Sequence, residues 1–304
     1  MSVAALAVVI GRLLALVAVG VALRVSGLLK ADDARVLNVV IIYVALPALI
    51  FRAIQPAALG WDLVLVAVVA WIAGLAGFAL AYVASRLLRL SRPTAGGLML
   101  TSALGNTGYI GYPVALGLLG SAGLVKAVFY DVFGTVGVLL TVGVLVCAAY
   151  GESEEKPHVL REFLTFPPFL AVLAALTLKS ASVPAAVSDW LDLLAKVVVP
   201  LIMISLGLSL EPRAIGRYAG PLSVVGALKL IALPLIALLA GRVLLASDPV
   251  ALRLVVLQAG MPTMMLAVVF GARFRLDVEL IAGAALVTTV AAILTIPALQ
   301  ALAG

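Results

Sequence analysis

The fold is decided around the stretch Thr101-Ser-Ala-Leu-Gly105-Asn106-Thr107-Gly108-Tyr-Ile-Gly-Tyr-Pro113, which lies within a long apolar segment. Three glycines followed by a proline weaken a regular helix near the middle of a membrane. Interrupted backbone at that depth is tolerated only where it is buried in protein or lines a cavity. The freed amides and the positive end of a half-helix would then suit an anion. The alternative is a kinked helix whose small residues let a neighbouring helix approach closely.

A second interruption is predicted at Gln258-Ala-Gly260-Met-Pro262-Thr263, because Pro262 removes a backbone donor. An ordinary proline kink would give the same pattern. Breaks at corresponding positions of two halves are typical of secondary transporters, which bind substrate near the midplane. The candidate ligands for a substrate or ion are Asn106, Thr107, Gln258 and Thr263, and the candidate breaks at the crossover are Gly105, Gly108, Pro113, Gly260 and Pro262.

The composition excludes a water-soluble globular protein. Hydrophobic residues make up 65% of the 304 residues and charged residues only 11%, whereas soluble domains carry about 25% charged residues. The net charge of +6 could suggest nucleic-acid binding, but the Lys and Arg residues are dispersed and not interleaved with aromatic residues. The chain is predicted to be an all-α, multi-pass membrane protein.

Ten segments meet or approach the roughly 20 apolar residues that a membrane-spanning helix needs. The sixth is the shortest, and the boundary between the fourth and fifth, at 120–123, is soft. The first segment lacks a preceding basic residue and a clear cleavage site, so we expect a retained helix rather than a signal peptide. The segments are 3–23, 35–54, 62–88, 94–119, 123–149, 167–181, 186–208, 221–245, 249–271 and 277–302.

The distribution of basic residues predicts the orientation in the cell membrane. With both termini outside, twelve Lys and Arg residues fall in the cytoplasmic loops and five in the outer loops, which agrees with the positive-inside rule. The cytoplasmic group is Arg24, Lys30, Arg35, Arg86, Arg89, Arg92, Lys156, Arg161, Arg213, Arg217, Arg273 and Arg275, and the outer group is Arg52, Lys126, Lys179, Arg242 and Arg253.

A hydrophilic stretch that ends at His158 divides the chain into two five-helix halves. The first repeat would cover 1–150, a short cytoplasmic loop 151–166, and the second repeat 167–304. An odd number of spans in each half inverts one half relative to the other. The stretch around Pro47 resembles that around Pro200, and Gly105-Asn106-Thr107 resembles the stretch around Gly260, at offsets of 153 and 155 residues. Such inverted repeats are typical of secondary transporters.

Two charged residues, Asp131 and Lys229, are predicted near the membrane midplane, where a charge is a functional candidate by default. They could form a buried ion pair, or Asp131 could carry a coupling proton or hold a cation. Asp192 and Lys196 are spaced i,i+4, which favours a local helix pair.

The sequence does not support an enzyme. The single Cys147 excludes an internal disulfide and a cysteine-rich metal site, and the single histidine lies in the polar loop. Asp131 has no second aspartate at comparable depth, and no phosphate-binding glycine-lysine loop occurs. We therefore expect no cofactor and no bound metal, apart from H⁺ or Na⁺ as a coupling ion.

Several motifs in order resemble the auxin efflux carrier family. They are the stretch 27–38, Tyr43-Val-Ala-Leu-Pro47, Gly105-Asn-Thr-Gly-Tyr-Ile-Gly-Tyr-Pro113, Lys229-Leu-Ile-Ala-Leu-Pro234, Met261-Pro262, and Thr288-Thr289 with Pro297. The resemblance covers nearly the whole chain. The 151–158 loop lacks the long hydrophilic insert of many plant members, so the chain resembles a prokaryotic-type carrier.

This resemblance implies two inverted five-helix repeats, similar to the bile-acid sodium symporter fold. Helices one, two, six and seven would form a scaffold and a homodimer contact. Helices three to five and eight to ten would form a moving core, with broken helices four and nine crossing at the substrate site. The substrate would be a small organic anion, such as an auxin-like carboxylate or a malate- or malonate-like dicarboxylate, carried by an elevator-like motion.

One departure from the family pattern concerns specificity. Thr263 is followed by Met264 and Met265, where many relatives carry small polar residues. Two thioethers would make the pocket more apolar and would favour an aromatic or amphipathic carboxylate. The alternative functional class is a channel or a non-transporting membrane sensor with a carrier-like fold.

Overall fold

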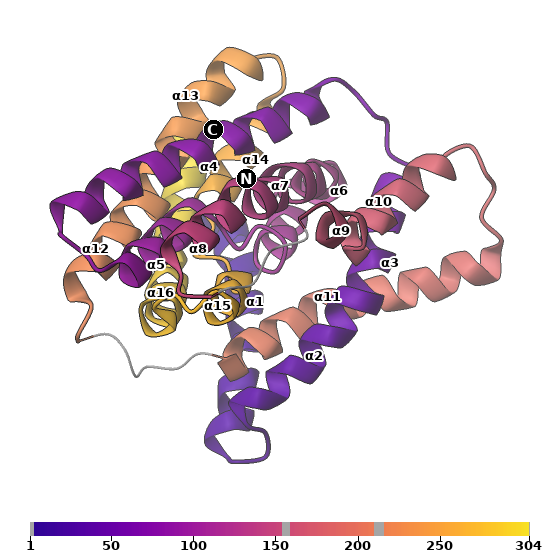
Figure 1. Cartoon of the computed structure of the whole chain (residues 1–304). Coiled ribbons are helices and arrows are strands. Elements are labelled where there is room, and N and C mark those ends of the chain that lie inside the picture. Colours follow the sequence, from indigo (N-terminus) through magenta and orange to yellow (C-terminus); the bar gives the residue numbers. More distant parts are fainter. Residues whose placement is uncertain (1–2, 154–158, 210–215, 304) are drawn as a thin grey trace. The chain divides into compact units, whose positions relative to one another are not determined.

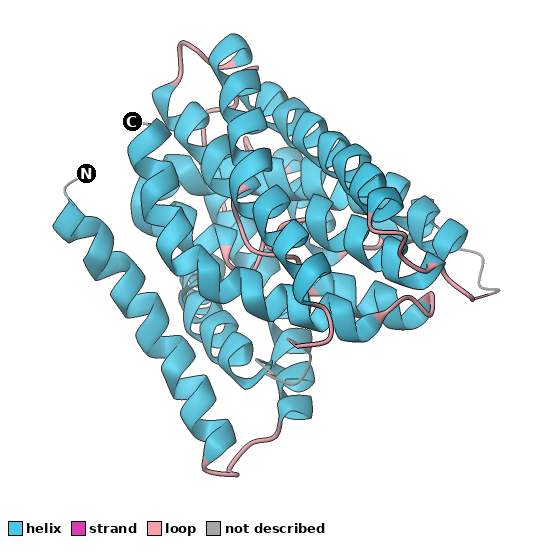
Figure 2. Cartoon of the chain, turned by 90° about the vertical axis from the view of Figure 1, so that its left-hand side faces the viewer, coloured by secondary structure: helices cyan, strands magenta, loops and turns pink. Residues whose placement is uncertain are grey.

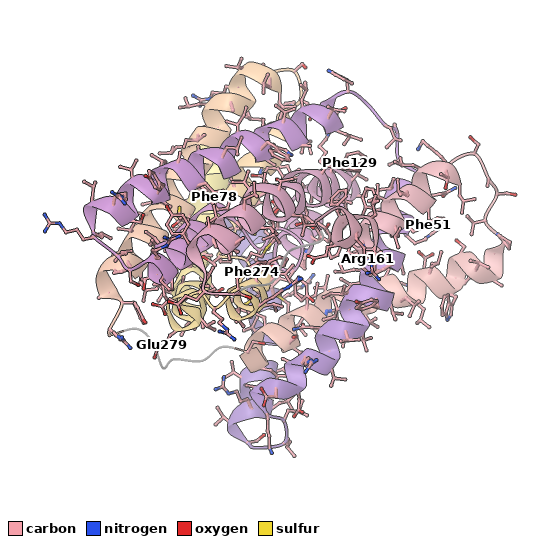
Figure 3. All side chains as sticks on the ribbon, in the orientation of Figure 1. Phe51, Phe78, Phe129, Arg161, Phe274 and Glu279 are labelled. Carbon is pink, nitrogen blue, oxygen red and sulfur yellow. The ribbon has the colours of Figure 1, made fainter. Side chains whose placement is uncertain are left out.

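The computed structural model describes residues 3–153, 159–209 and 216–303. Every regular element in these ranges is helical, which confirms the predicted all-α fold (Figure 2). Lys156, His158 and Arg213, which contribute to the loop and orientation predictions, lie outside the described residues. Carbon-rich side chains project from the helices on all sides (Figure 3), as the composition requires.

Six helices of the described residues are long and apolar enough to cross a membrane. Pro167–Thr177 and Pro249–Ala259 are shorter apolar helices. The six are Ala31–Ile54, Asp62–Leu87, Gly111–Tyr150, Ala185–Ser209, Ala219–Leu244 and Val278–Ala301.

The chain divides into two compact units. Unit 1 comprises Met1–Leu59, Pro113–Val125 and Arg161–Leu210, and unit 2 comprises Gly60–Tyr112, Lys126–Leu160 and Glu211–Gly304. The helix α6 (Gly111–Phe129) contributes to both units. α9 (Val159–Leu164) crosses the boundary between Leu160 and Arg161.

Unit 1 is built around the long helix α11 (Ala185–Ser209), which packs against α1 (Val3–Val25), α2 (Ala34–Val40) and α3 (Leu46–Ile54) (Figure 1). The 3₁₀ turn η1 (Ala31–Asp33) precedes α2, and α10 (Pro167–Thr177) packs on α3. α1 and α11 touch through backbone, because a Cβ on Gly20 would lie 2.2 Å from the carbonyl of Ile204. Small residues permit such close helix approach.

The predicted pair between Asp192 and Lys196 is wrong. The carboxylate of Asp192 accepts two hydrogen bonds from the guanidinium of Arg52, at 2.6 and 3.0 Å, and Lys196 is exposed. A planar guanidinium matches the two carboxylate oxygens better than a single ammonium does. The tertiary contact therefore replaces the local one.

Unit 2 contains the remaining helices. They are α4 (Asp62–Leu87), α5 (Arg92–Ala103), α7 (Val136–Val138), α8 (Val144–Tyr150), α12 (Ala219–Ala227), α13 (Leu233–Leu244), α14 (Pro249–Ala259), α15 (Leu266–Arg273) and α16 (Val278–Ala303) (Figure 1). α4 packs against α5 and α13, and α16 packs against α5, α12 and α14. Phe274 (Figure 3) directly follows α15 and is fully buried, and its carbonyl accepts a hydrogen bond from the amide of Glu152.

Four π-helical turns widen the helices of the two units. They are η2 (Ile41–Ala45), η3 (Tyr130–Thr135), η4 (Leu139–Gly143) and η5 (Leu228–Ala232). η2 and η5 precede Pro47 and Pro234, whose rings would clash with the carbonyl four residues earlier in a regular helix. The wider turn relieves that clash. η3 and η5 contain Asp131 and Lys229, the two predicted midplane charges.

One predicted boundary and one predicted segment differ in the structure. The boundary expected at 120–123 reduces to a kink at Gly120, whose φ of 69° is unfavourable for residues with a side chain. The sixth segment, predicted over 167–181, has only the eleven residues of α10, which at about 1.5 Å per residue cannot cross a membrane core of about 30 Å. Pro167 and Pro168 fix its start.

Lys126 joins the starts of two helices of unit 2. Its ammonium binds the carboxylate of Asp62, the first residue of α4, and lies 2.7 Å from that of Asp248. Asp248 is also the N-cap of α14 and accepts a 2.9 Å hydrogen bond from the amide of Ala251. These contacts fix the N-terminal end of α14, which ends at Ala259 just before the predicted break at Gly260 and Pro262.

Candidate functional site: paired helix interruptions

Two interruptions between helices lie in unit 2, and they bind one another. α5 ends at Ala103 and α6 begins at Gly111, while α14 ends at Ala259 and α15 begins at Leu266. The amide of Asn106 donates to the carbonyl of Pro262 at 2.7 Å, and the amide of Met264 donates to the carbonyl of Leu104 at 3.0 Å. Gly105 and Thr263 thereby form an isolated antiparallel bridge. Backbone groups that the broken helices leave free are satisfied across the crossing, as burial requires.

Thr263 binds both the interrupted helix α5 and the neighbouring helix α16. Its hydroxyl donates to the carbonyl of Thr101 at 3.0 Å, and its amide donates to the hydroxyl of Thr288 at 2.9 Å. Thr263 is fully buried. Its proton is used in holding α5, so any ligand would find only a hydroxyl lone pair.

The amide side chains of Asn106 and Gln258 each have one end bound to backbone. Gln258 Nε2 donates to the carbonyl of Thr107 at 3.2 Å, and Asn106 Oδ1 accepts from the amide of Tyr109 at 3.2 Å. Backbone groups have a fixed polarity, so these contacts define both amide orientations. Gln258 Oε1 and Asn106 Nδ2 then have no partner among the described residues, although the two residues are 0% and 3% exposed. Unsatisfied buried polar groups are uncommon and call for an explanation.

Asp131 is held by two hydroxyl groups. Its buried carboxylate accepts a short hydrogen bond from the hydroxyl of Thr107 and a second, of 2.7 Å, from the hydroxyl of Tyr112. Thr107 lies in the interruption after α5, and Tyr112 lies in the first turn of α6. Thr107 therefore makes two contacts at the crossing: its carbonyl accepts a hydrogen bond from Gln258, and its hydroxyl donates one to the carboxylate of Asp131.

Lys229 brings a buried positive charge to the crossing. Its ammonium donates to the carbonyl of Ala259, the last residue of α14, at 2.6 Å, and the residue is 2% exposed. Among the described residues, Lys229 and Asp131 do not form an ion pair with one another. The ammonium binds the carbonyl of Ala259, and the carboxylate accepts from the two hydroxyl groups. A buried charge is tolerated only when nearby dipoles or charges compensate it.

A small cavity, about the size of a water molecule, lies at the crossing within unit 2. Its lining includes Gly105, Thr107, Tyr130, Lys229, Gln258 and Ala259. Met264 and Met265 are not among the lining residues, so the hypothesis of a more apolar pocket stays a prediction.

Three glycines make room for the polar groups. A Cβ on Gly105 would lie 3.0 Å from Lys229 Nζ, and one on Gly108 would lie 3.0 Å from Asp131 Oδ2. A Cβ on Gly111 would lie 2.1 Å from Gln258 Oε1, closer than atoms can approach. These glycines therefore allow polar side chains to lie close to the backbone, in addition to interrupting the helix.

The remaining predicted break residues have distinct positions. Gly260 directly follows α14, and Pro262 supplies the carbonyl that Asn106 binds. Pro113 lies within the first turn of α6, where a missing amide proton costs nothing. The sequence favoured a packing role for Tyr112, and it gave no indication of the carbonyl of Ala259; the Tyr112 hydroxyl next to the glycine-rich stretch was the available signal.

A sequence model of the family described as "Membrane transport protein" matches residues 5–299. The chain belongs to this family, the auxin efflux carriers. As a family member with several apolar helices long enough to cross a bilayer, it is a multi-pass membrane transporter.

Three relatives of this family member carry transporter names. An "Uncharacterized transporter" of Methanothermobacter thermautotrophicus is 36% identical and covers 93% of this chain and 94% of its own. A second "Uncharacterized transporter", of Methanocaldococcus jannaschii, is 33% identical and also covers 93% of this chain and 94% of its own. A "Putative malonate transporter" of Rhizobium meliloti is 28% identical and covers 86% of this chain and 85% of its own.

Proposed function

We propose that the protein is a secondary transporter of a small organic anion, and that the anion binds at the paired helix interruptions. The observation that carries this proposal is the buried ammonium of Lys229 beside a cavity in the crossing. An ammonium has three donors, and Lys229 has one protein acceptor among the described residues. A carboxylate is the natural partner for the other two.

The neighbouring polar groups would complete the site. Asn106 has a free amide donor and Gln258 a free carbonyl acceptor, and Thr107 and Thr263 offer hydroxyl oxygens. These groups would replace the water around a carboxylate.

The substrate would be a carboxylate of small size. The name of the Rhizobium relative supports a dicarboxylate such as malonate. The two methionines after Thr263 favour an aromatic or amphipathic carboxylate instead. Both classes belong in the first binding experiment.

The transport step would be an elevator-like movement of unit 2, with unit 1 as scaffold and homodimer contact. Two facts support it: each unit is compact by itself, and all candidate ligands belong to unit 2. The inverted five-helix repeats and an orientation with both termini outside, in the cell membrane, are part of the same proposal. The excess of basic residues in the loops assigned to the cytoplasm supports the orientation.

The test is counterflow in proteoliposomes loaded with unlabelled anion. We expect saturable uptake of labelled malonate, malate or indole-3-acetate that is accelerated by the same anion inside. Uptake that does not saturate and is not accelerated would indicate a channel. An absence of both uptake and ligand-induced thermal stabilisation for every carboxylate would reject the proposed function, since a ligand at about 100 times its Kd adds about 2.7 kcal/mol to stability.

A further inference from the structure

Lys229 lies where the two interrupted helices of unit 2 end. Its ammonium binds the carbonyl of Ala259 at the end of α14, and it lies 3.0 Å from the position of a Cβ on Gly105, two residues beyond the end of α5. Each helix C-terminus carries a partial negative charge of about −0.5. The ammonium therefore binds the negative end of α14 directly and lies beside the residues that follow the end of α5.

No carboxylate of the described residues pairs with this ammonium. The buried carboxylate in the same site, that of Asp131, is bound by the hydroxyls of Thr107 and Tyr112. The charge of Lys229 is thus compensated by backbone dipoles. In broken-helix carriers the half-helix C-terminal ends and unwound carbonyls are the groups that coordinate Na⁺.

We infer that the ammonium of Lys229 is a resident cation of the crossing and takes the role that a bound Na⁺ has in sodium-coupled carriers, so that transport needs no Na⁺. This inference rests on the proposed function for its transport consequence. The carbonyl of Ala259 is already occupied, and a metal cation beside it would be repelled by the ammonium. The positive charge that an anion needs is supplied by the chain itself.

The first experiment measures anion counterflow by the wild-type protein in Na⁺, K⁺ and choline media. Equal rates in the three media support the inference. A loss of roughly tenfold or more in choline, which corresponds to about 1.4 kcal/mol of coupling, would overturn it. The same comparison of Tm in detergent provides a readout without transport, and a rise in Tm specific to Na⁺ would likewise overturn it.

The second experiment replaces the side chain by Lys229→Ala and adds a small cation. Loss of a charge-assisted hydrogen bond should lower counterflow about tenfold or more, and methylammonium should restore part of it by filling the vacated volume. Lys196→Ala, at an exposed lysine of α11, is the matched control and should behave as wild type. Full counterflow by Lys229→Ala without any added cation would overturn the inference.

These outcomes separate the inference from the proposed function. If the wild type shows no counterflow of any anion in any medium, the proposed function fails, and the Tm measurements still decide the role of Lys229. Methylammonium should then raise the Tm of Lys229→Ala and leave those of the wild type and Lys196→Ala unchanged. A variant with no response to methylammonium, together with Na⁺ stabilisation of the wild type, would reject the resident cation.

Discussion

The backbone amide of Asn106 donates a 2.7 Å hydrogen bond to the backbone carbonyl of Pro262, which joins the two helix interruptions of unit 2. Because both partners are main-chain groups, side-chain substitutions at the crossing leave this bond in place. The side chains can therefore be tested for ligand binding with less disturbance of the local backbone.

Asn106→Ala should abolish anion counterflow while the protein remains folded. The substitution removes the free Nδ2 donor and one hydrogen bond of 3.2 Å from the amide of Tyr109. The second loss should cost about 1 kcal/mol of stability. Counterflow and Tm of the purified variant are the measurements.

The control for this variant is Asn38→Ala in unit 1. Asn38 Oδ1 accepts one hydrogen bond from the hydroxyl of Ser205 at 2.7 Å, so its removal should cost a similar amount of stability. We expect normal counterflow for this control. Undiminished flux in Asn106→Ala would remove Asn106 from the site.

Gly111→Ala should displace the side chain of Gln258, because the new Cβ would lie 2.1 Å from Oε1. We expect both lower stability, by about 1–3 kcal/mol, and reduced counterflow. Gly226→Ala in α12 is the matched control, since its Cβ would meet nothing within 4 Å. The control should keep or slightly raise Tm, and a Tm of Gly111→Ala equal to that of the control would contradict the close contact.

The hydrogen bond from the Tyr112 hydroxyl to Asp131 should make the effects of Tyr112→Phe and Asp131→Asn on the free energy of unfolding non-additive. A hydrogen bond to a charged group is worth about 1.5–3 kcal/mol, and residues in one network couple by about 0.5–3 kcal/mol. Denaturant unfolding of the four proteins of the cycle measures this coupling. Tyr130→Phe is the control, because no hydrogen bond of the Tyr130 hydroxyl is found among the described residues. Additive effects of Tyr112→Phe and Asp131→Asn on the free energy of unfolding would exclude the proposed network.

The ion pair of Asp248 with Lys126 predicts a pH-dependent stability. Partial burial by itself would raise the pKa of Asp248, but the hydrogen bonds from Lys126 and the amide of Ala251 outweigh it and hold the pKa below the ordinary value. A carboxylate with a lowered folded-state pKa stabilises the protein above the unfolded value of about 3.9, and this stabilisation is lost as the pH falls through the folded value.

The variant Asp248→Asn keeps a helix-capping side chain and removes only the charge. Its Tm should lie below that of the wild type at neutral pH, and the difference should narrow below about pH 4. Asp32→Asn, at an exposed aspartate of η1, is the control and should show a smaller difference at neutral pH. A difference for Asp248→Asn that is constant from neutral to acid pH would reject the stabilising ion pair.

The all-helical fold could be predicted from the sequence because apolar segments of sufficient length allow few other structures in a membrane. The interruption after Ala103 follows from local chemistry as well, since glycines and prolines act on the backbone wherever they occur. Both are properties of short stretches of chain.

The partners of charged groups could not be predicted in the same way. Asp192 binds Arg52, 140 residues away, and Lys229 binds a backbone carbonyl that has no signature in the sequence. The free ends of the Asn106 and Gln258 amides depend on contacts between distant segments. Such partners are fixed by tertiary packing, which a single sequence does not reveal.

The π-helical turns at Asp131 and Lys229 have a consequence for comparing relatives. A π turn accommodates one residue more than an α turn does, and an extra residue rotates the following helix by about 100° relative to regular α-helical phase. A homologue that lacks or gains a single residue within these two spans could therefore absorb the change at η3 or η5, while the helix faces on both sides keep their alignment.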